Sequence, residues 1–181
     1  MNKCTDYNGS KTELNLLKAF AAEAQAHCKY TYFASIAKKA GYEQIAEIFA
    51  NTATNELEHA KIWFKELGML SDTCHNLRCA ITGEHSEWNG MYDVMAKEAD
   101  YEGYNDIATI FRGVADIERT HEERFAKLLH NIEVQEVFRR NGLVIWECRN
   151  CGHIEIGTVA PSECPVCSHP QAYFQIKAEN Y

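Results

Sequence analysis

The sequence predicts an all-α four-helix bundle over residues 1–141, followed by a small, metal-stapled β-rich domain over residues 142–181. Three observations predict this arrangement. A Glu-x-x-His element occurs twice, at Glu56–His59 and again at Glu118–His121. No proline precedes Pro161, so the long segment before it can be nearly all helix. Two Cys-x-x-Cys pairs also lie near the end of the chain, where they can hold a metal ion.

The doubled element belongs to a longer repeat. Gly41–Phe49 aligns with Gly103–Phe111 at the same offset as the two Glu-x-x-His elements, and Tyr30 aligns with Tyr92. Two residues three apart on a helix project from one face, so each Glu-x-x-His element can offer a carboxylate and an imidazole to one ion. The repeated unit is predicted to be a pair of helices, and two such pairs make a four-helix bundle.

The first helix pair is predicted from capping and periodicity. Ser10 and Glu13 form a capping-box pattern, and apolar residues then follow helical spacing, which predicts a helix from about Lys11 to Lys39. Gly41 ends it, and a second helix is predicted from about residue 42 to residue 67. The stretch from Gly68 to Gly83 lacks a clear period and is predicted to be a crossover connection with room for a short helical turn.

The second helix pair and the small domain follow. Helices are predicted from about Glu84 to Tyr101 and from about Tyr104 to Asn131, with residues 132–140 either extending the last helix or forming a short separate one. The Asn141-Gly142 dipeptide has a strong turn preference, which places the domain boundary there. Three short β-prone segments lie beyond it, at Leu143–Glu147, Ile154–Gly157 and Ala172–Ile176.

Acidic residues within the apolar faces predict a dinuclear metal site. An unpaired buried carboxylate is expensive, so several inward-facing acids need a cation. A Glu from each of two helices, with Glu-x-x-His from each of the other two, is typical of ferritin-like di-iron or di-manganese proteins. A single Glu-x-x-His usually marks only a solvated face, and the ligand set leaves iron and manganese open. The predicted donors are Glu23, Glu56, His59, Glu84, Glu118 and His121, with Glu87 as an additional acid one turn from Glu84.

The two cysteine pairs predict a second, separate metal site. Four thiolates held tetrahedrally bind zinc or a single iron, and the ligands do not decide between them. A zinc ribbon that serves only stability therefore stays open, because so small a domain needs a staple to fold. The four predicted ligands are Cys148, Cys151, Cys164 and Cys167.

Composition excludes several classes of function. The formal net charge of −8 and the scattered lysines argue against a nucleic-acid surface. No stretch approaches the ~20 apolar residues of a membrane span, and no secretion signal precedes the first helix. With half of its eight cysteines in a metal-type pattern, the chain is expected to work in the reducing cytoplasm.

Taken together, the two halves resemble rubrerythrin from end to end. The Glu-rich helical part is similar to that family's bundle, and Cys148–His153 with Cys164–Cys167 resembles its rubredoxin-like domain. The resemblance implies a non-haem di-iron centre bound by all seven acids and histidines above, and one iron bound by the four cysteines. Zinc or manganese could substitute at either site. Ser168 departs from the glycine that often follows the last cysteine in such knuckles.

The resemblance also implies an activity. Hydrogen peroxide would be reduced to water at the di-iron centre as protection against oxidative stress, with electrons refilled through the cysteine-bound iron. Glu56 and Glu118 would bridge the irons, and one iron would exchange Glu87 for His59 on reduction. Tyr30 and Tyr92, one or two turns from the acids, could hydrogen-bond to ligand carboxylates or could simply pack.

Partners follow from the same resemblance. Electron transfer needs the two sites close together, so a head-to-tail homodimer is expected, with a rubredoxin or an NAD(P)H-dependent reductase as electron donor. Two other functions stay open. A ferritin-like ferroxidase or iron-storage protein shares the bundle but leaves the cysteine domain unexplained. A zinc-bound structural or interaction module would be colourless.

Overall fold

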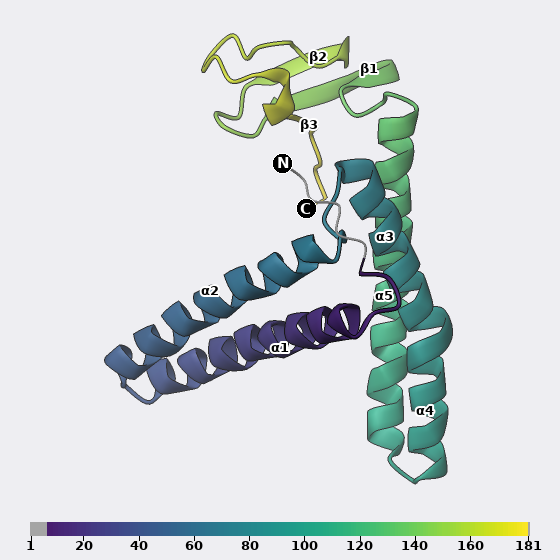
Figure 1. Cartoon of the computed structure of the whole chain (residues 1–181). Helices are drawn as coiled ribbons and strands as arrows, with labels where there is room; N and C mark the ends of the chain where they lie inside the picture. Colours follow the sequence, from purple (N-terminus) through teal and green to yellow (C-terminus); the bar gives the residue numbers. More distant parts are fainter. Residues whose placement is uncertain (1–6, 181) are drawn as a thin grey trace. The chain divides into compact units, whose positions relative to one another are not determined.

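The computed structural model describes residues 7–180, and the chain divides into two compact units between Asp72 and Thr73 (Figure 1). The start of the predicted bundle domain, before Tyr7, and Tyr181 lie outside the described residues. The mostly helical fold with a small C-terminal sheet agrees with the predicted fold class, whereas the domain limits at residues 141 and 142 stay a prediction.

The first unit is a helical hairpin made of α1 (Lys11–Lys39) and α2 (Glu43–Glu66), which lie side by side. The predicted cap begins α1, since the Ser10 Oγ accepts from the Glu13 backbone N–H at 3.1 Å. The Glu13 carboxylate accepts from the Gly9 N–H at 2.7 Å, one residue before the usual capping-box partner. The predicted bounds of this helix pair are confirmed within one or two residues.

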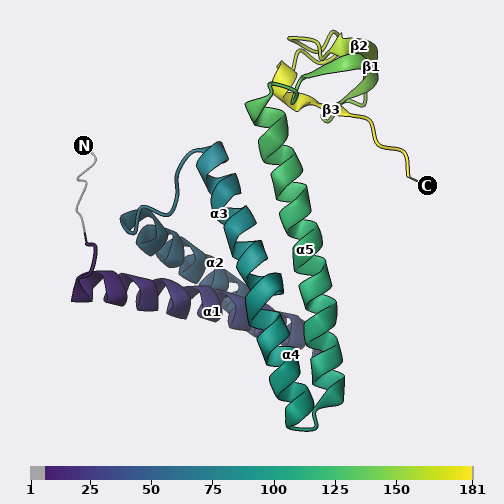
Figure 2. The ribbon, with the colours of Figure 1, turned by 90° about the vertical axis from the view of Figure 1, so that its right-hand side faces the viewer.

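The second unit begins with a longer helical arm than the sequence predicted. It contains α3 (Thr73–Ser86), a π-helical turn η1 (Glu87–Met91), α4 (Tyr92–Tyr101) and α5 (Asn105–Glu133). Figure 2 shows α3 and α4 running beside α5. The prediction that residues 73–83 belong to a connection is wrong. The half-buried residues Cys74, Leu77 and Ile81 do recur at helical spacing, but this apolar pattern is short and Gly83 follows it, which is why the sequence predicts a connection here.

The two helix pairs turn in the same way. Gly41, at a φ of 81°, and Gly103, at a φ of 88°, adopt the left-handed conformation that ends a helix in a Schellman motif. In the first hairpin the Tyr42 N–H donates to the Ala37 carbonyl at 3.0 Å. At the equivalent place in the second hairpin, the Tyr104 N–H donates to the Ala99 carbonyl at 2.8 Å. The repeat predicted from sequence is therefore also a structural repeat.

Packing inside each hairpin repeats as well. The Tyr30 and Phe49 ring centroids lie 6.0 Å apart, and so do those of Tyr92 and Phe111. The buried residues of both hairpins are small, which allows the helix backbones to approach closely. The buried alanines are Ala37, Ala46, Ala53 and Ala60 in the first unit and Ala96, Ala99 and Ala108 in the second.

The C-terminal part is a three-stranded antiparallel sheet in the order β2-β1-β3. Its strands are β1 (Arg139–Cys148), β2 (Ile154–Val159) and β3 (Phe174–Ile176), the last preceded by a 3-10 turn at Gln171–Tyr173. The three predicted β-prone segments coincide with these elements. Their core packs around two cysteines, and its buried members are Trp146, Cys148, Ala160, Cys164 and Phe174.

The junction between helix and sheet differs from the prediction. The helix α5 ends at Glu133 and β1 begins at Arg139, so residues 134–140 neither extend the helix nor form a separate one. Asn141 and Gly142 lie inside β1, where the pairing with β2 shifts register between Arg139 and Val144. The dipeptide is thus accommodated by an irregularity in a strand and does not form a reversing turn.

Candidate metal centres

The first hairpin brings three predicted ligands together. Glu23 comes from α1, while Glu56 and His59 lie three residues apart on α2, and donor atoms of all three lie within 4.8 Å of one another. The His59 Nδ1 is 2.9 Å from the Glu56 Oε2 and 3.9 Å from the Glu23 Oε2. Two carboxylates and one imidazole therefore converge on one point, and we call this group the first half-site.

The second hairpin repeats this arrangement. Glu84 comes from α3, and Glu118 and His121 come from α5, again with donor atoms within 4.8 Å of one another. The His121 Nδ1 is 2.7 Å from the Glu118 Oε2 and 3.6 Å from the Glu84 Oε2. We call this group the second half-site. Six of the seven predicted ligands thus gather as two groups of the same composition and nearly the same geometry.

The electrostatics of both half-sites favour a bound cation. The hydrogen bond with the Glu56 carboxyl group, followed by burial and the Glu56 charge, raises the pKa of Glu23. Burial, followed by the hydrogen bond and charge of Glu118, raises the pKa of Glu84. Two carboxyl groups held this close can share a proton, or a cation can replace it. Oxygen-rich ligation with one imidazole suits iron or manganese, so the donors fit the metals that the sequence predicts.

Glu87, the seventh predicted ligand, lies in the π-helical turn outside both three-donor groups. It is nevertheless close to the second half-site. Its charge contributes to the raised pKa of Glu84, after burial and Glu118. Burial, followed by the charges of Glu87 and Glu118, likewise raises the pKa of the Tyr92 hydroxyl. The charges of two predicted ligands therefore act on Tyr92, whereas the contacts that the structure gives for the Tyr30 ring are aromatic packing.

The π-helical turn is the element of this site that sequence analysis missed. Seven positions separate Glu23 from Tyr30, but eight separate Glu84 from Tyr92. An α-helix with one residue too many can close the difference with i→i+5 hydrogen bonds, and the turn at Glu87–Met91 does this. The repeat is in register again at Tyr92. The one-position mismatch between the aligned acids was the signal that could have revealed the turn.

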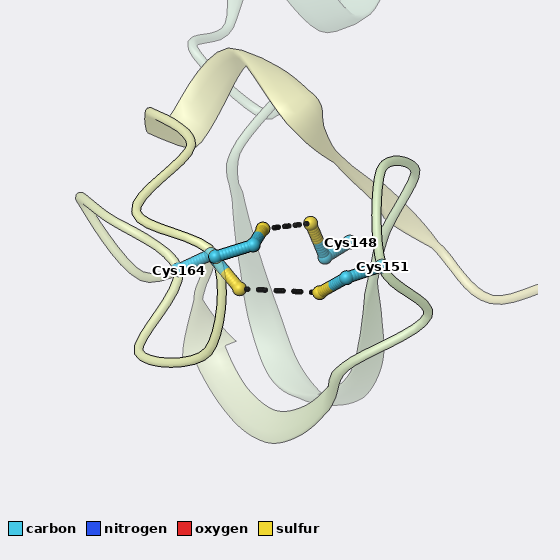
Figure 3. A group of neighbouring side chains, drawn as sticks. Cys148, Cys151 and Cys164 are labelled. Carbon is cyan, nitrogen blue, oxygen red and sulfur yellow. Dashed lines mark hydrogen bonds between the residues drawn. The ribbon is translucent and has the colours of Figure 1, made fainter.

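The four predicted cysteines also come together. Their sulfur atoms lie within 4.8 Å of one another, with 3.7 Å between the Sγ atoms of Cys148 and Cys167 and 3.6 Å between those of Cys151 and Cys164 (Figure 3). Four sulfurs placed tetrahedrally at about 2.3 Å from a metal lie about 3.8 Å from one another. The spacing of the sulfurs therefore fits a tetrahedral metal site.

Two similar turns hold these cysteines. The Gly152 N–H donates to the Cys148 carbonyl at 2.8 Å, and the Ser168 N–H donates to the Cys164 carbonyl at 2.9 Å. Both turns need a left-handed residue, with a φ of 77° at Gly152 and 56° at Ser168. Ser168 thus occupies a position that favours glycine.

Two of these cysteines differ in the pKa of their thiol groups. The His169 backbone N–H is the main cause that lowers the pKa of Cys167. The His153 backbone N–H favours the Cys151 thiolate in the same way, but partial desolvation and the three neighbouring cysteines outweigh it and raise the pKa of Cys151 to about 12. Neighbouring cysteines therefore oppose the loss of every proton from the group. A metal cation that binds all four sulfurs must displace the protons that remain.

Comparison with known proteins decides the family. The family model for rubrerythrin matches residues 15–74 and 75–145, and the model for the rubrerythrin rubredoxin-like domain matches residues 146–175. The chain belongs to the rubrerythrin family. Rubrerythrins are generally oxidoreductases that combine a di-iron part with a rubredoxin-like part. The first two matched segments divide at residue 74, close to the border between the two hairpins.

Relatives resemble the chain over nearly their whole length. Rubrerythrin from Porphyromonas gingivalis is 46% identical over 194 residues, covering 100% of this chain and 96% of the relative. Rubrerythrin from Nitratidesulfovibrio vulgaris is 44% identical over 186 residues, covering 96% and 97%. A solved structure of nigerythrin in a mixed-valence state is 28% identical and covers 98% of this chain and 92% of its own, with a TM-score of 0.36. That superposition is too loose for a comparison of sites.

Within residues 7–180, none of the helices combines the length and the apolar character that crossing a bilayer requires.

Proposed function

We propose that this rubrerythrin-family protein reduces hydrogen peroxide to water at a di-iron centre, with electrons supplied through an iron bound by the four cysteines. The observation that carries the proposal is the combination, in one chain, of two Glu/His half-sites with a tetrahedral cysteine group. A ferroxidase function would use the half-sites but leave the cysteine group without a role. A purely structural zinc protein would use the cysteine group alone.

The residues of the two half-sites would hold the iron ions. When bound, the irons supply the two electrons that reduce one molecule of hydrogen peroxide, with two protons, to two molecules of water. The four half-site carboxylates carry four negative charges, which balance two ferrous ions. Glu87 adds a fifth negative charge, which favours the more highly charged oxidised state. The balancing acids are Glu23, Glu56, Glu84 and Glu118.

The two histidines differ in a way that supports the proposed ligand exchange. The exposed fraction of the side chain is 52% for His59 and 36% for His121. The more exposed imidazole is less restrained by packing, so it can leave and return at lower cost. We therefore assign His59 as the imidazole that alternates with Glu87, and His121 as a permanent ligand. Glu56 and Glu118, whose carboxylates lie 2.9 Å and 2.7 Å from the Nδ1 atoms of His59 and His121, would bind both irons.

Visible spectroscopy tests the proposal. The iron-loaded protein should show the charge-transfer absorption of ferric thiolate, which a reductant should bleach and hydrogen peroxide should restore. A protein that is coloured but stays bleached after peroxide would contradict peroxide reduction. A colourless protein with zinc in the cysteine site would support the structural alternative.

The assembly and its location are part of the same proposal. We propose a head-to-tail homodimer in which the cysteine-bound iron of one chain serves the di-iron centre of its partner, with a rubredoxin or an NAD(P)H-dependent reductase as donor in the cytoplasm. None of the cysteines in the described part of the chain forms a disulfide, which suits a reducing compartment. Light scattering coupled to size-exclusion chromatography should give the mass of a dimer. A large shell-like assembly would favour iron storage, and a fully active monomer would refute the head-to-tail arrangement.

A further inference from the structure

The side-chain carboxylate of Glu122, on α5, contacts two residues of the neighbouring helical segment: His85 in α3 and Trp88 in η1. The Trp88 Nε1 donates to the Glu122 Oε2, and the His85 Nδ1 lies 3.2 Å from both Glu122 oxygens. The Asn89 side-chain amide donates to the His85 Nε2 at 3.2 Å. Because the Nε2 accepts in this network, the Nδ1 carries the proton and donates to Glu122. Glu122 thus accepts hydrogen bonds from both residues, and the indole N–H is the main cause that lowers its pKa.

This network exists only in the hairpin that contains the inserted residue, as far as the described residues show. The residue of the first hairpin that aligns with Glu122 is Ala60, a buried alanine that can accept no hydrogen bond through its side chain. The first hairpin also has no π-helical turn, since α1 is α-helical throughout. The carboxylate and the turn therefore occur together in one half of the repeat and are both missing from the other.

The two residues that contact Glu122 lie on either side of Glu87 in the sequence. His85 is two residues before it and Trp88 is the next residue, and their rings contact each other edge to face with centroids 5.2 Å apart. A π-helical turn is rare and occurs mostly as a single turn inside an α-helix, so contacts from neighbouring residues are expected to help hold it. Two hydrogen bonds to the Glu122 carboxylate, whose side chain is only 23% exposed, fix the rotation of this segment about its axis.

We propose that Glu122 is a positioning residue that holds the π-helical turn and thereby sets the orientation of Glu87 toward the second half-site. The consequence for turnover rests on the proposed function, whereas the effect on the turn does not. Glu122 itself stays outside the three-donor groups. It acts on the reaction only through Glu87.

Hydrogen exchange of the metal-free, full-length chain tests the structural step. Glu122→Ala gives the second hairpin the residue that the first hairpin has, and Glu123→Ala removes the neighbouring exposed carboxylate as a matched control. Backbone amides of residues 87–92 should exchange about 10-fold faster in Glu122→Ala, which corresponds to the loss of roughly one net hydrogen bond. They should be unchanged in Glu123→Ala. Unchanged exchange in Glu122→Ala would overturn the proposal.

A double-mutant cycle tests the link to Glu87. In the iron-loaded protein, Glu122→Ala should lower kcat for peroxide about 10-fold with little change in KM, as for other residues that orient metal ligands. In a Glu87→Ala background the same substitution should change kcat by less than about 2-fold, because the residue through which it acts is gone. Equal slowing in both backgrounds would overturn the proposal.

Two further variants keep the test decisive. Glu122→Gln retains an oxygen that can accept from Trp88, so it should recover most of the slow exchange and of kcat. If Glu122→Ala does not fold, Trp88→Phe removes the indole donor and keeps an aromatic ring. Faster exchange at residues 87–92 would then support the proposal, and unchanged exchange would refute it. If the wild type reduces no peroxide at all, the proposed function fails while the exchange measurement still decides the role of Glu122.

Discussion

The two hairpins form the same three-donor group on different backbones. The first builds it from two regular α-helices. The second builds it from α5 and from α3, which continues into the π-helical turn that contains one extra residue. The distances from histidine to the nearer carboxylate, 2.9 Å and 2.7 Å, are nearly equal in spite of that difference. The π-helical turn absorbs the insertion without disturbing the donors, and it adds an acid, Glu87, that the first hairpin does not have. Asymmetry can thus enter a duplicated site without loss of its ligands.

Replacing each histidine in turn should reveal the largest difference between the two half-sites. If His121 is a permanent ligand and His59 an exchangeable one, His121→Ala should weaken metal binding about 100-fold, and His59→Ala about 10-fold, because Glu87 can replace His59. Titration of the metal-free protein with cobalt(II) and its absorption spectrum would measure both affinities. Equal losses in the two variants would contradict the assigned roles.

Deleting Gly90 would make the second hairpin resemble the first. The spacing from Glu84 to the following tyrosine becomes seven, so the π-helical turn should close into an α-helix while the second half-site survives. Stability should rise by about 1 kcal/mol, since a glycine leaves a helix interior, whereas peroxide turnover should fall about 10-fold because Glu87 is rotated away. Chemical denaturation, metal analysis and steady-state kinetics would check these outcomes. Full activity would show that the turn has no role in catalysis.

Replacing Glu84 with a neutral side chain should show that its charge destabilises the metal-free protein. Its pKa is raised in the folded state, so the stability linked to this group is present below its unfolded pKa and is lost as the pH rises through the folded value. At pH 7 the metal-free Glu84→Gln variant should therefore melt a few degrees higher than the wild type, and the difference should vanish near pH 4. Glu123→Gln, at an exposed position, serves as control. A gain that persists unchanged at pH 4 would contradict the electrostatic cause.

The two cysteine turns offer a second, smaller comparison. Gly152 and Ser168 hold equivalent left-handed positions, but only glycine does so without strain. Ser168→Gly should stabilise the metal-loaded small domain by about 1 kcal/mol and leave its absorption spectrum unchanged. Thermal unfolding followed through the ferric-thiolate band would measure this change. A destabilised variant would mean that the serine side chain makes contacts worth more than the backbone strain.

Periodicity and spacing predicted most of the fold and named residues that the structure brings together, whereas metal binding by these residues stays a prediction. The helix break at Gly41 and the hairpin helices follow from residue type and offset alone. The sequence predicted one site fed by all four helices, and the structure gathers six of its proposed ligands into two groups, one in each hairpin.

The start of α3 was missed because its apolar pattern, Cys74, Leu77 and Ile81, is short and is followed by Gly83. The π-helical turn was detectable only as the one-residue difference between the Glu23–Tyr30 and Glu84–Tyr92 spacings. The role of Glu122 depends on contacts between α3, η1 and α5, and such contacts leave no mark in a local pattern.

The completeness of the first half-site within one hairpin has a consequence for biosynthesis. All three of its donors lie on α1 and α2, so the ligand set is present once His59 has left the ribosome, well before the first metal-binding cysteine is made. Metal binding lowers the free energy of the folded state relative to the unfolded one. An ion captured at this stage can therefore stabilise the nascent hairpin while the rest of the chain is still being translated.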